Sequence, residues 1–243
     1  MLQFEKKNRG VLQVETSGTP TAPALVAQIR SDIISGVYKP DERLKFAFLA
    51  KRYSCSFGSL RESLTSLVSE GFVTSQANKG FAVAPVSSAE LLEVTEHYID
   101  LEKRAIVSAI DNGDDVWESN IVASHHRLKF IENQTWKVRV ELHDDWLKRH
   151  REFHWSLVSA SEGIWLLRLR SMMFDQLDRY RFITKISSEG MGERKFLEHK
   201  QLMEATVNRN KEMVTKLIES HIRDTAERAL ALMPKYNVRM EKT

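Results

Sequence analysis

The chain has 243 residues, of which 42% are hydrophobic and 28% are charged, an ordinary balance for a globular protein in water. This length allows one large or two ordinary domains, and a formal net charge of +3 is too small to indicate a nucleic-acid partner by itself. We find no secretory signal at the start and no apolar run near the roughly 18 residues that span a membrane. Cys55 is the only cysteine, which excludes an intrachain disulfide and fits a reducing cytoplasm.

Residues 1–20 carry no sustained hydrophobic period and end in Ser-Gly-Thr-Pro, so we expect a flexible N-terminal arm. The next segment, residues 21–86, changes from helical to strand-like spacing. Apolar residues at intervals of three and four predict short helices, over residues 25–34, 46–50 and 57–70. Two β-like runs around an Asn-Lys-Gly turn predict a hairpin, over residues 72–74 and 81–83. Short helices followed by a hairpin are the layout of a winged helix-turn-helix domain.

In such a domain the third helix enters the major groove of DNA, and the hairpin reaches the neighbouring minor groove or backbone. Small polar groups and a cation on that helix can meet base edges, while a glycine in the hairpin lets the backbone approach the sugar-phosphate chain. Arg61 and Lys79, taken singly, are better explained as solvated charges, and the order of the elements is what favours DNA binding. The residues expected at the DNA are Lys45, Ser56, Phe57, Gly58, Ser59, Arg61, Asn78, Lys79 and Gly80, with Lys51 and Arg52 as further phosphate contacts.

Residues 87–235 predict an all-helical domain, and residues 236–243 a C-terminal tail. Ser87-Ser88-Ala89-Glu90 is a capping box that opens a long helix, which ends at Asn112-Gly113. Helices with short connections predict an antiparallel bundle. They are expected over about residues 88–112, 114–133, 138–160, 164–186, 192–208 and 211–233.

Four of the eight histidines share a geometric pattern. His150 and His154 are four residues apart, so their rings project from the same side of a helix. His199 and His221 are equidistant from the predicted turn at residues 208–210, which places them at the same height of an antiparallel helix pair. If the first helix packs beside this pair, the four imidazoles converge inside the bundle. Neutral imidazoles bind Zn²⁺, Ni²⁺, Cu²⁺ or Fe²⁺, and an open position on such an ion accepts water or a carboxylate.

Each of these histidines alone is better explained as a core or surface residue, and only the two pairs together favour a metal site. We expect Zn²⁺ or Ni²⁺ as the ion. A metal-dependent hydrolase is a competing class, because a bound metal activates water when a carboxylate stands beside it. Glu152 and Glu198 adjoin two of the histidines, but neighbouring residues on a helix point in different directions.

The first domain resembles the DNA-binding domain of the GntR superfamily. The similar segments are residues 29–36 (IRSDIISG), 40–44 (PDERL), 56–64 (SFGSLRESL), 70–73 (EGFV) and 78–83 (NKGFAV). Arg61 and Glu62 match the family, which usually has an arginine where this chain has Phe57 and a proline at Ser59. A phenylalanine at this position either packs on a thymine methyl or lies inside the domain.

The second domain resembles the ligand-binding domain of the FadR-like subfamily, over residues 88–232. The similar segments are residues 151–154 (REFH), 198–199 (EH) and 220–222 (SHI). The resemblance implies a metal held by one aspartate and three histidines, with His154, His199 and His221 matching and His150 where the aspartate is usual. It also implies an organic-acid effector paired with an arginine, but Tyr98 stands at that position. Other cations that could face the cavity are Arg104, Arg168, Arg179 and Arg181, although each of them alone is better explained as a solvated charge.

Together these features predict a mostly α-helical, metal-containing transcription regulator that responds to a small molecule and acts as a repressor. We expect a homodimer that reads an imperfect palindrome, because two-fold symmetry in a protein matches two-fold symmetry in its operator. Two alternatives remain open: a DNA-binding architectural protein whose helical domain only dimerises, and the metal-dependent hydrolase.

Overall fold

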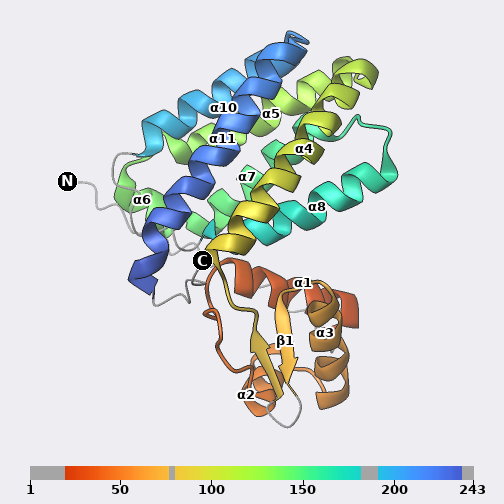
Figure 1. Cartoon of the computed structure of the whole chain (residues 1–243), viewed down its shortest axis with the longest axis vertical. Helices are drawn as coiled ribbons and strands as arrows, with labels where there is room; N and C mark the ends of the chain where they lie inside the picture. Colours follow the sequence, from red (N-terminus) through yellow and green to blue (C-terminus); the bar gives the residue numbers. More distant parts are fainter. Residues whose placement is uncertain (1–19, 77–79, 182–190, 237–243) are drawn as a thin grey trace, which may run out of the picture.

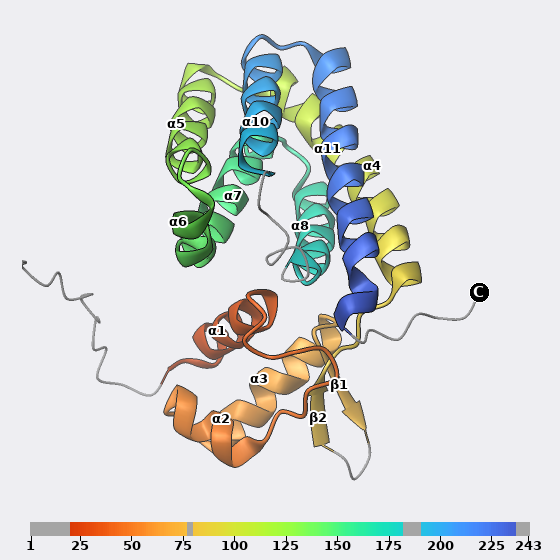
Figure 2. The same ribbon diagram turned by 90° about the vertical axis from the view of Figure 1, so that its left-hand side faces the viewer.

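A computed structural model of the chain describes residues 20–76, 80–181 and 191–236. Its described residues form a small N-terminal head of helices and one hairpin, followed by a larger helical bundle (Figure 1). The head lies against one end of the bundle, and the chain passes from the hairpin directly into the first long helix of the bundle (Figure 2). The mostly helical fold, with a winged helix-turn-helix before an all-helical domain, is confirmed.

The head is built around apolar side chains that its helices turn inward. Its elements are α1 (Ala22–Ile34), α2 (Phe46–Tyr53), α3 (Phe57–Ser69), β1 (Val73–Gln76) and β2 (Gly80–Val83). The two strands pair antiparallel, with Val73 opposite Val83. The fully buried residues at the centre of its core are Leu25, Ile29, Leu49, Leu60, Leu64 and Leu67.

Local signals fix where the third helix begins and ends. Ser56 caps its N-terminus, because the Ser56 Oγ atom accepts a hydrogen bond from the backbone N–H of Ser59 at 3.1 Å. Gly71 follows its C-terminus with a φ of 79°, a left-handed conformation that glycine adopts without steric cost. The helix therefore presents one exposed N-terminal end, at Ser56, Phe57 and Gly58.

The bundle encloses one large apolar core between its helices. Helix α4 packs against α8 and α11, while α5 packs against α7 and α10. Within the described ranges, every helix is too short or too polar to serve as a membrane span. The helices are α4 (Ser88–Asn112), α5 (Asp115–Glu132), α6 (Trp136–Glu141), α7 (His143–Val158), α8 (Ile164–Asp178), α10 (Met191–Val207) and α11 (Lys211–Leu232), with a 3-10 turn at Met233–Tyr236.

Two helix predictions in the bundle need correction. The segment 138–160 forms two helices, because the backbone of Leu142, at φ −92° and ψ 16°, leaves the α-helical region between α6 and α7. Asp144 and Asp145 then occupy the first turn of α7, where the helix dipole favours carboxylates. Helix α8 ends at Asp178 rather than at residue 186, and residues 182–186 lie outside the described part of the chain.

The head and the bundle meet at the C-terminal end of α8. Gln176 donates a hydrogen bond from Nε2 to the backbone oxygen of Glu70 at 2.6 Å. Arg179 is buried and donates to the backbone oxygens of Gly71, at 3.1 Å, and Pro85, at 2.6 Å. Because Gly71 precedes β1 and Pro85 follows β2, the C-terminal end of α8 contacts the backbone at both ends of the hairpin.

Candidate functional site

Four buried histidine rings meet inside the bundle. Helix α7 supplies His150 and His154 one turn apart, α10 supplies His199 and α11 supplies His221. One ligand nitrogen from each ring lies within 4.8 Å of the other three. The ring centroids of His150 and His154 are 4.4 Å apart, and those of His199 and His221 are 4.9 Å apart. The structure thus brings together the four histidines that sequence spacing grouped.

The turn between α10 and α11 sets the height of His199 against His221. Arg209 in this turn has a left-handed φ of 54°, and Asn210 caps α11 by accepting a hydrogen bond from the backbone N–H of Met213 at 3.0 Å. Because the chain reverses direction there, residues at equal distances from the turn lie side by side.

Burial keeps two of the rings neutral. Desolvation lowers the pKa of His150 and His154 well below the ordinary value, with the charge of Arg181 next in importance at His150 and that of His221 next at His154. Within the described part of the chain, neither ring nitrogen of His154 has a hydrogen-bond partner. A buried polar atom without a partner costs stability, so a neutral imidazole in this position fits a metal ion as its partner.

Two carboxylates stand behind the histidines. The Glu132 Oε1 atom lies 2.8 Å from Nδ1 of His199, and the Glu198 Oε2 atom lies 2.9 Å from Nδ1 of His221. A carboxylate hydrogen-bonded to Nδ1 fixes the tautomer and orientation of an imidazole whose Nε2 binds metal. The Glu198–His221 contact has hydrogen-bond geometry, whereas the Glu132–His199 contact is close but lacks it. The expectation that Glu198 points away from the histidines is wrong, because its side chain reaches the ring on the neighbouring helix.

The dimensions of the cluster also fit a transition-metal ion. A zinc–nitrogen bond is about 2.0–2.1 Å long, so the nitrogens of a tetrahedral site are about 3.4 Å apart. The ligand nitrogens of this cluster all lie within 4.8 Å of one another, so an ion held by all four would draw them closer together.

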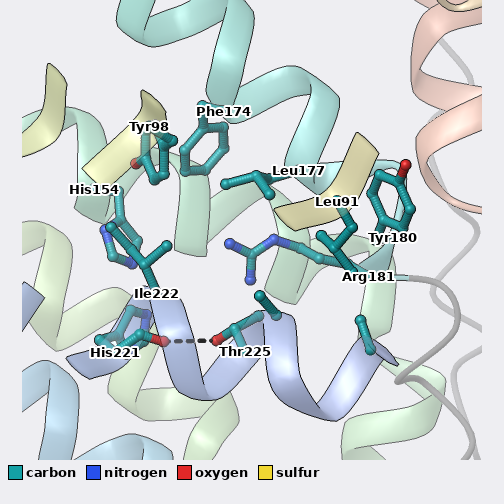
Figure 3. A pocket seen from close by; sticks show the side chains of 12 residues that line it. Leu91, Tyr98, His154, Phe174, Leu177, Tyr180, Arg181, His221, Ile222 and Thr225 are labelled. Carbon is teal, nitrogen blue, oxygen red and sulfur yellow. Dashed lines mark hydrogen bonds between the residues drawn. The ribbon is translucent and has the colours of Figure 1, made fainter. Parts of the chain in front are cut away.

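A small cavity adjoins the histidine cluster (Figure 3). Its volume of about 20 Å³ has room for little more than a water molecule. His154 and His221 form part of its wall, and Arg181 extends its guanidinium into it from beyond the end of α8 (Figure 3). Much of the remaining wall is apolar and includes Phe174 and Leu177. The cavity therefore combines one cation with two of the four candidate metal ligands.

The structure places only some of the residues expected to bind an effector at the cavity. Tyr98 does line the cavity, as does Arg181. Arg104 is exposed, because it lies two residues from the fully buried Glu102 and hence on the opposite side of α4. Arg168 is also exposed, and its guanidinium stacks on the Trp165 ring at 5.1 Å. These two arginines therefore do not face the cavity, which agrees with the alternative that they are solvated charges.

Arg179 needs the same correction for a different reason. Its guanidinium is buried, but it bonds to backbone oxygens of the head rather than facing the cavity. The prediction fails because α8 ends one residue earlier, so the chain turns Arg179 toward the head and Arg181 toward the cavity.

A buried ion pair beside the cavity is absent from the sequence-based set. Arg170 donates to the two carboxylate oxygens of Glu102 at 2.5 Å and 3.0 Å, and both residues are almost completely buried. Arg170 also donates to the Tyr98 hydroxyl at 3.1 Å and to the backbone oxygen of His154 at 3.2 Å. The sequence does contain a signal for this pair. Glu102 falls on the apolar face of α4 between Ile99 and Ile106, and a charged residue buried on such a face usually has a partner.

The exposed end of α3 displays the residues expected to read DNA. Phe57 is 58% exposed, which excludes the alternative that it lies inside the domain. Its ring meets Phe46 edge to face at 5.9 Å, and the Arg61 guanidinium lies over the same Phe46 ring at 5.5 Å. The hydroxyls of Ser56 and Ser59 hydrogen-bond to each other at 3.0 Å, and the Ser56 hydroxyl also caps the helix.

The other predicted DNA contacts are distributed around this end. Lys45 is exposed just before α2, and Gly80 opens β2 with a φ of 78° that strongly favours glycine. Arg52 is paired with Asp32 at 3.0 Å, which makes it a weaker candidate for a phosphate contact. Asn78 and Lys79 lie outside the described residues.

Comparisons with known proteins place both domains in one family. Residues 21–83 match the bacterial regulatory proteins of the gntR family, and residues 93–224 match the FCD domain. The chain is 35% identical over 198 residues to the HTH-type transcriptional repressor GlaR of Escherichia coli (strain K12), a match that covers 80% of this chain and 89% of GlaR. It is 33% identical over 199 residues to BphR of Paraburkholderia xenovorans (strain LB400), an uncharacterized HTH-type transcriptional regulator, with 82% of this chain and 81% of BphR covered.

Solved structures share the fold. Escherichia coli McbR/YncC superposes with a TM-score of 0.74 at 17% identity, covering 89% of this chain and 98% of that one. The crystal structure titled as a putative transcriptional regulator GntR from Rhodococcus sp. RHA1 superposes with a TM-score of 0.68 at 15% identity, covering 86% of this chain and 97% of that one.

A gntR-type DNA-binding head followed by an FCD domain is the domain arrangement of bacterial transcription regulators. The chain belongs to the gntR family of bacterial regulatory proteins, and its C-terminal domain is an FCD domain. It is a DNA-binding transcriptional regulator and not an enzyme, which removes the hydrolase alternative.

Proposed function

We propose that this regulator is a repressor that holds a divalent transition metal, senses a small carboxylate and binds its operator as a homodimer. The observation that carries the proposal is the cavity in which Arg181 faces two of the four buried histidines. A cation and candidate metal ligands at the same small opening are suited to recognising an anion.

The four histidines would hold the ion, and an all-imidazole set suits Zn²⁺ or Ni²⁺. A bound ion supplies an open coordination position for a carboxylate oxygen. Arg181 supplies parallel N–H donors to the same carboxylate, a geometry that favours arginine over lysine. The apolar wall at Phe174 and Leu177 would cover the carbon skeleton of the ligand.

Ligand entry requires the protein to move. The cavity holds about one water molecule, so any organic acid must widen it. Arg181 currently forms an ion pair with Asp178, and a ligand carboxylate would compete for the same guanidinium. The segment that gives way is therefore the turn at the end of α8, which carries both residues.

The same turn would transmit the change to the head. Arg181 and Tyr180 line the cavity, while Gln176 and Arg179 bond to the backbone at the two ends of the hairpin. A ligand that prefers one arrangement of this turn also biases the position of the head, since it shifts the equilibrium between the two arrangements. In a homodimer on a palindromic operator, such a shift alters the match between two heads and two half-sites, and we propose that it releases DNA.

The proposal is tested on the purified full-length protein. Elemental analysis measures the metal, and duplexes selected by the protein from a random pool supply the operator. A panel of mono-, di- and hydroxycarboxylates is then screened for thermal stabilisation, where a ligand at 100 times its Kd adds about 2.7 kcal/mol and raises Tm by about 5–10 °C. We expect at least one carboxylate to stabilise the protein and to weaken operator binding in fluorescence anisotropy.

The matched variants are Arg181→Gln and, as the control, Arg104→Gln on the outer surface. The first should lose the carboxylate response and keep operator binding, while the second should behave like the parent. A parent protein that carries metal but responds to no carboxylate would instead favour the architectural alternative, and an Arg181→Gln variant with a full response would remove Arg181 from the site.

A further inference from the structure

Two phenylalanine rings of the head are exposed to the same extent. Phe57, the first residue of α3, and Phe48, in α2, are each 58% exposed. A single exposed apolar side chain is common on protein surfaces and needs no functional explanation. Phe57 differs in its neighbour, because its ring meets the Phe46 ring edge to face, with centroids 5.9 Å apart and an interplanar angle of 83°. The exposed ring of Phe57 is therefore supported by a second ring.

Phe46 supports more than one group at this end of the head. Its half-buried ring also lies 5.9 Å from the ring of Phe81 on β2, and the Arg61 guanidinium lies over it at 5.5 Å. Aromatic pairs and a cation over an aromatic ring are both favourable contacts. Phe46 thus holds an apolar ring and a cation side by side at the N-terminal end of α3.

The surroundings of the Phe57 ring suit a polyanion. Lys45 is exposed directly before Phe46, and Arg61 is exposed one helical turn after Phe57. The acidic Glu62 lines a groove that α3 forms with α1. The chain is a DNA-binding regulator, and α3 is the helix of its winged helix-turn-helix that enters the major groove. Charge and position both indicate that the edge of a base pair covers Phe57 in the complex.

A phenylalanine ring can distinguish one kind of base edge in the major groove. It carries no hydrogen-bonding nitrogen or oxygen, so it gains nothing from the donors and acceptors that guanine, cytosine and adenine present there. Thymine adds an apolar group, the C5 methyl. Contact between the ring and this methyl removes apolar surface of both partners from water, which is favourable.

We infer that Phe57 reads the methyl group of a thymine in each operator half-site, and that Phe46 is the positioning residue that holds the Phe57 ring beside the Arg61 guanidinium. The inference rests on the operator binding of the proposed function and is independent of the metal and of the carboxylate.

The first test removes the methyl group from the DNA and leaves the protein unchanged. Each thymine of the operator that the full-length protein selects from a random pool is replaced by deoxyuridine, at symmetry-related positions of both half-sites. Fluorescence anisotropy measures the affinity. At one position the affinity should fall by about 4-fold for each half-site, the effect of burying one methyl group. An operator in which no thymine shows this loss would overturn the inference and leave operator binding intact.

The second test removes the ring. Phe57→Ala should bind the thymine and deoxyuridine operators equally well, because it lacks the side chain that contacts the methyl group. Phe48→Ala is the matched control, since Phe48 is equally exposed in the parent, and it should keep the full difference. A Phe57→Ala variant that keeps the difference would overturn the inference. So would one that weakens binding to the operator and to unrelated duplexes by the same factor.

Phe46→Leu tests the positioning role. Leucine keeps an apolar side chain against Phe81 but removes the ring that Phe57 and Arg61 contact. The ratio of the affinities for the thymine and deoxyuridine operators should fall below that of the parent, whereas a smaller folded fraction lowers both affinities alike. Circular dichroism checks the fold. A parental ratio in Phe46→Leu would remove the positioning role, and a parent protein that selects no duplex would overturn the operator binding of the proposed function together with this inference.

Discussion

Arg170 and Glu102 form an ion pair that water does not reach, and Arg170 also donates hydrogen bonds to Tyr98 and to the backbone of His154. Removing one partner of a buried pair leaves an uncompensated charge, which costs far more than the pair contributes. We therefore expect Arg170→Met to lower the free energy of unfolding by about 3–5 kcal/mol, measured by urea denaturation.

Arg168→Met on the same helix is the control, because Arg168 is exposed. Its unfolding free energy should stay within about 0.5 kcal/mol of the parent. A loss of less than about 1 kcal/mol for Arg170→Met would mean that Glu102 finds another partner or takes up a proton.

Arg61 is the cation best placed to reach DNA from α3. It is exposed near the N-terminal end of the helix, with its guanidinium over the Phe46 ring. Arg61→Ala should weaken binding to the selected operator by about 1–3 kcal/mol if the side chain contacts a base or a phosphate. Titrations at several salt concentrations distinguish the two, since loss of one phosphate contact lowers the salt slope by about one. Unchanged affinity would place Arg61 outside the interface.

The histidine cluster could be predicted from sequence spacing because its geometry follows from two local rules. His150 and His154 are one helical turn apart, and α10 and α11 run antiparallel from a turn centred on Asn210. The arginine that faces the cavity was harder to predict. Arg179 and Arg181 point in different directions because the chain turns after α8, and the position of that turn depends on where α8 ends. The carboxylates Glu132 and Glu198 could not be assigned, because each touches a histidine on another helix and only tertiary packing defines that contact.

At the scale of elements, the short turn after α8 joins two sites. Arg179 bonds to the head, and Arg181, two residues later, enters the cavity. Arg179→Met should leave carboxylate binding intact but reduce the effect of the carboxylate on operator affinity, which for coupled sites is typically about 5–150-fold. Thermal shifts measure the first quantity, and operator titrations with and without ligand measure the second.

The exposed Arg168→Met variant serves here too, and it should retain the full coupling. If Arg179→Met also retains the full ligand effect on DNA, the signal passes by another route, such as the direct link from β2 into α4.

The break between α6 and α7 shows why some element boundaries were missed. Hydrophobic spacing runs on through Leu142, and only the paired aspartates after it indicate a new helix start. The cap at Ser87 was clearer, because its capping-box pattern is visible in the sequence, and in the structure Ser87, Ser56 and Asn210 each accept a hydrogen bond from the backbone three residues later. Boundaries that depend on a side-chain cap can be predicted from sequence more easily than those that depend on a dipole.

For the whole molecule, the order of a winged helix-turn-helix and a helical domain followed from periodicity alone, because each pattern repeats over many residues. How the two domains contact each other did not, since it depends on backbone oxygens that every residue possesses. The division at residue 86 stays a prediction, and it falls between the two segments that match known domains, 21–83 and 93–224.

A small rotation of α3 at its contact with Gln176 and Arg179 moves the far end of the helix by a larger distance. Its C-terminal end is anchored through Glu70 and Gly71, while its reading tip lies 13 residues away, a lever of about 20 Å. Pivoting such a lever by about 10° sweeps the tip through about 3.5 Å, close to the rise of one base pair. A tilt of about 10° at the Arg179 junction is thus enough to move the tip of α3 by about one base-pair step along its DNA.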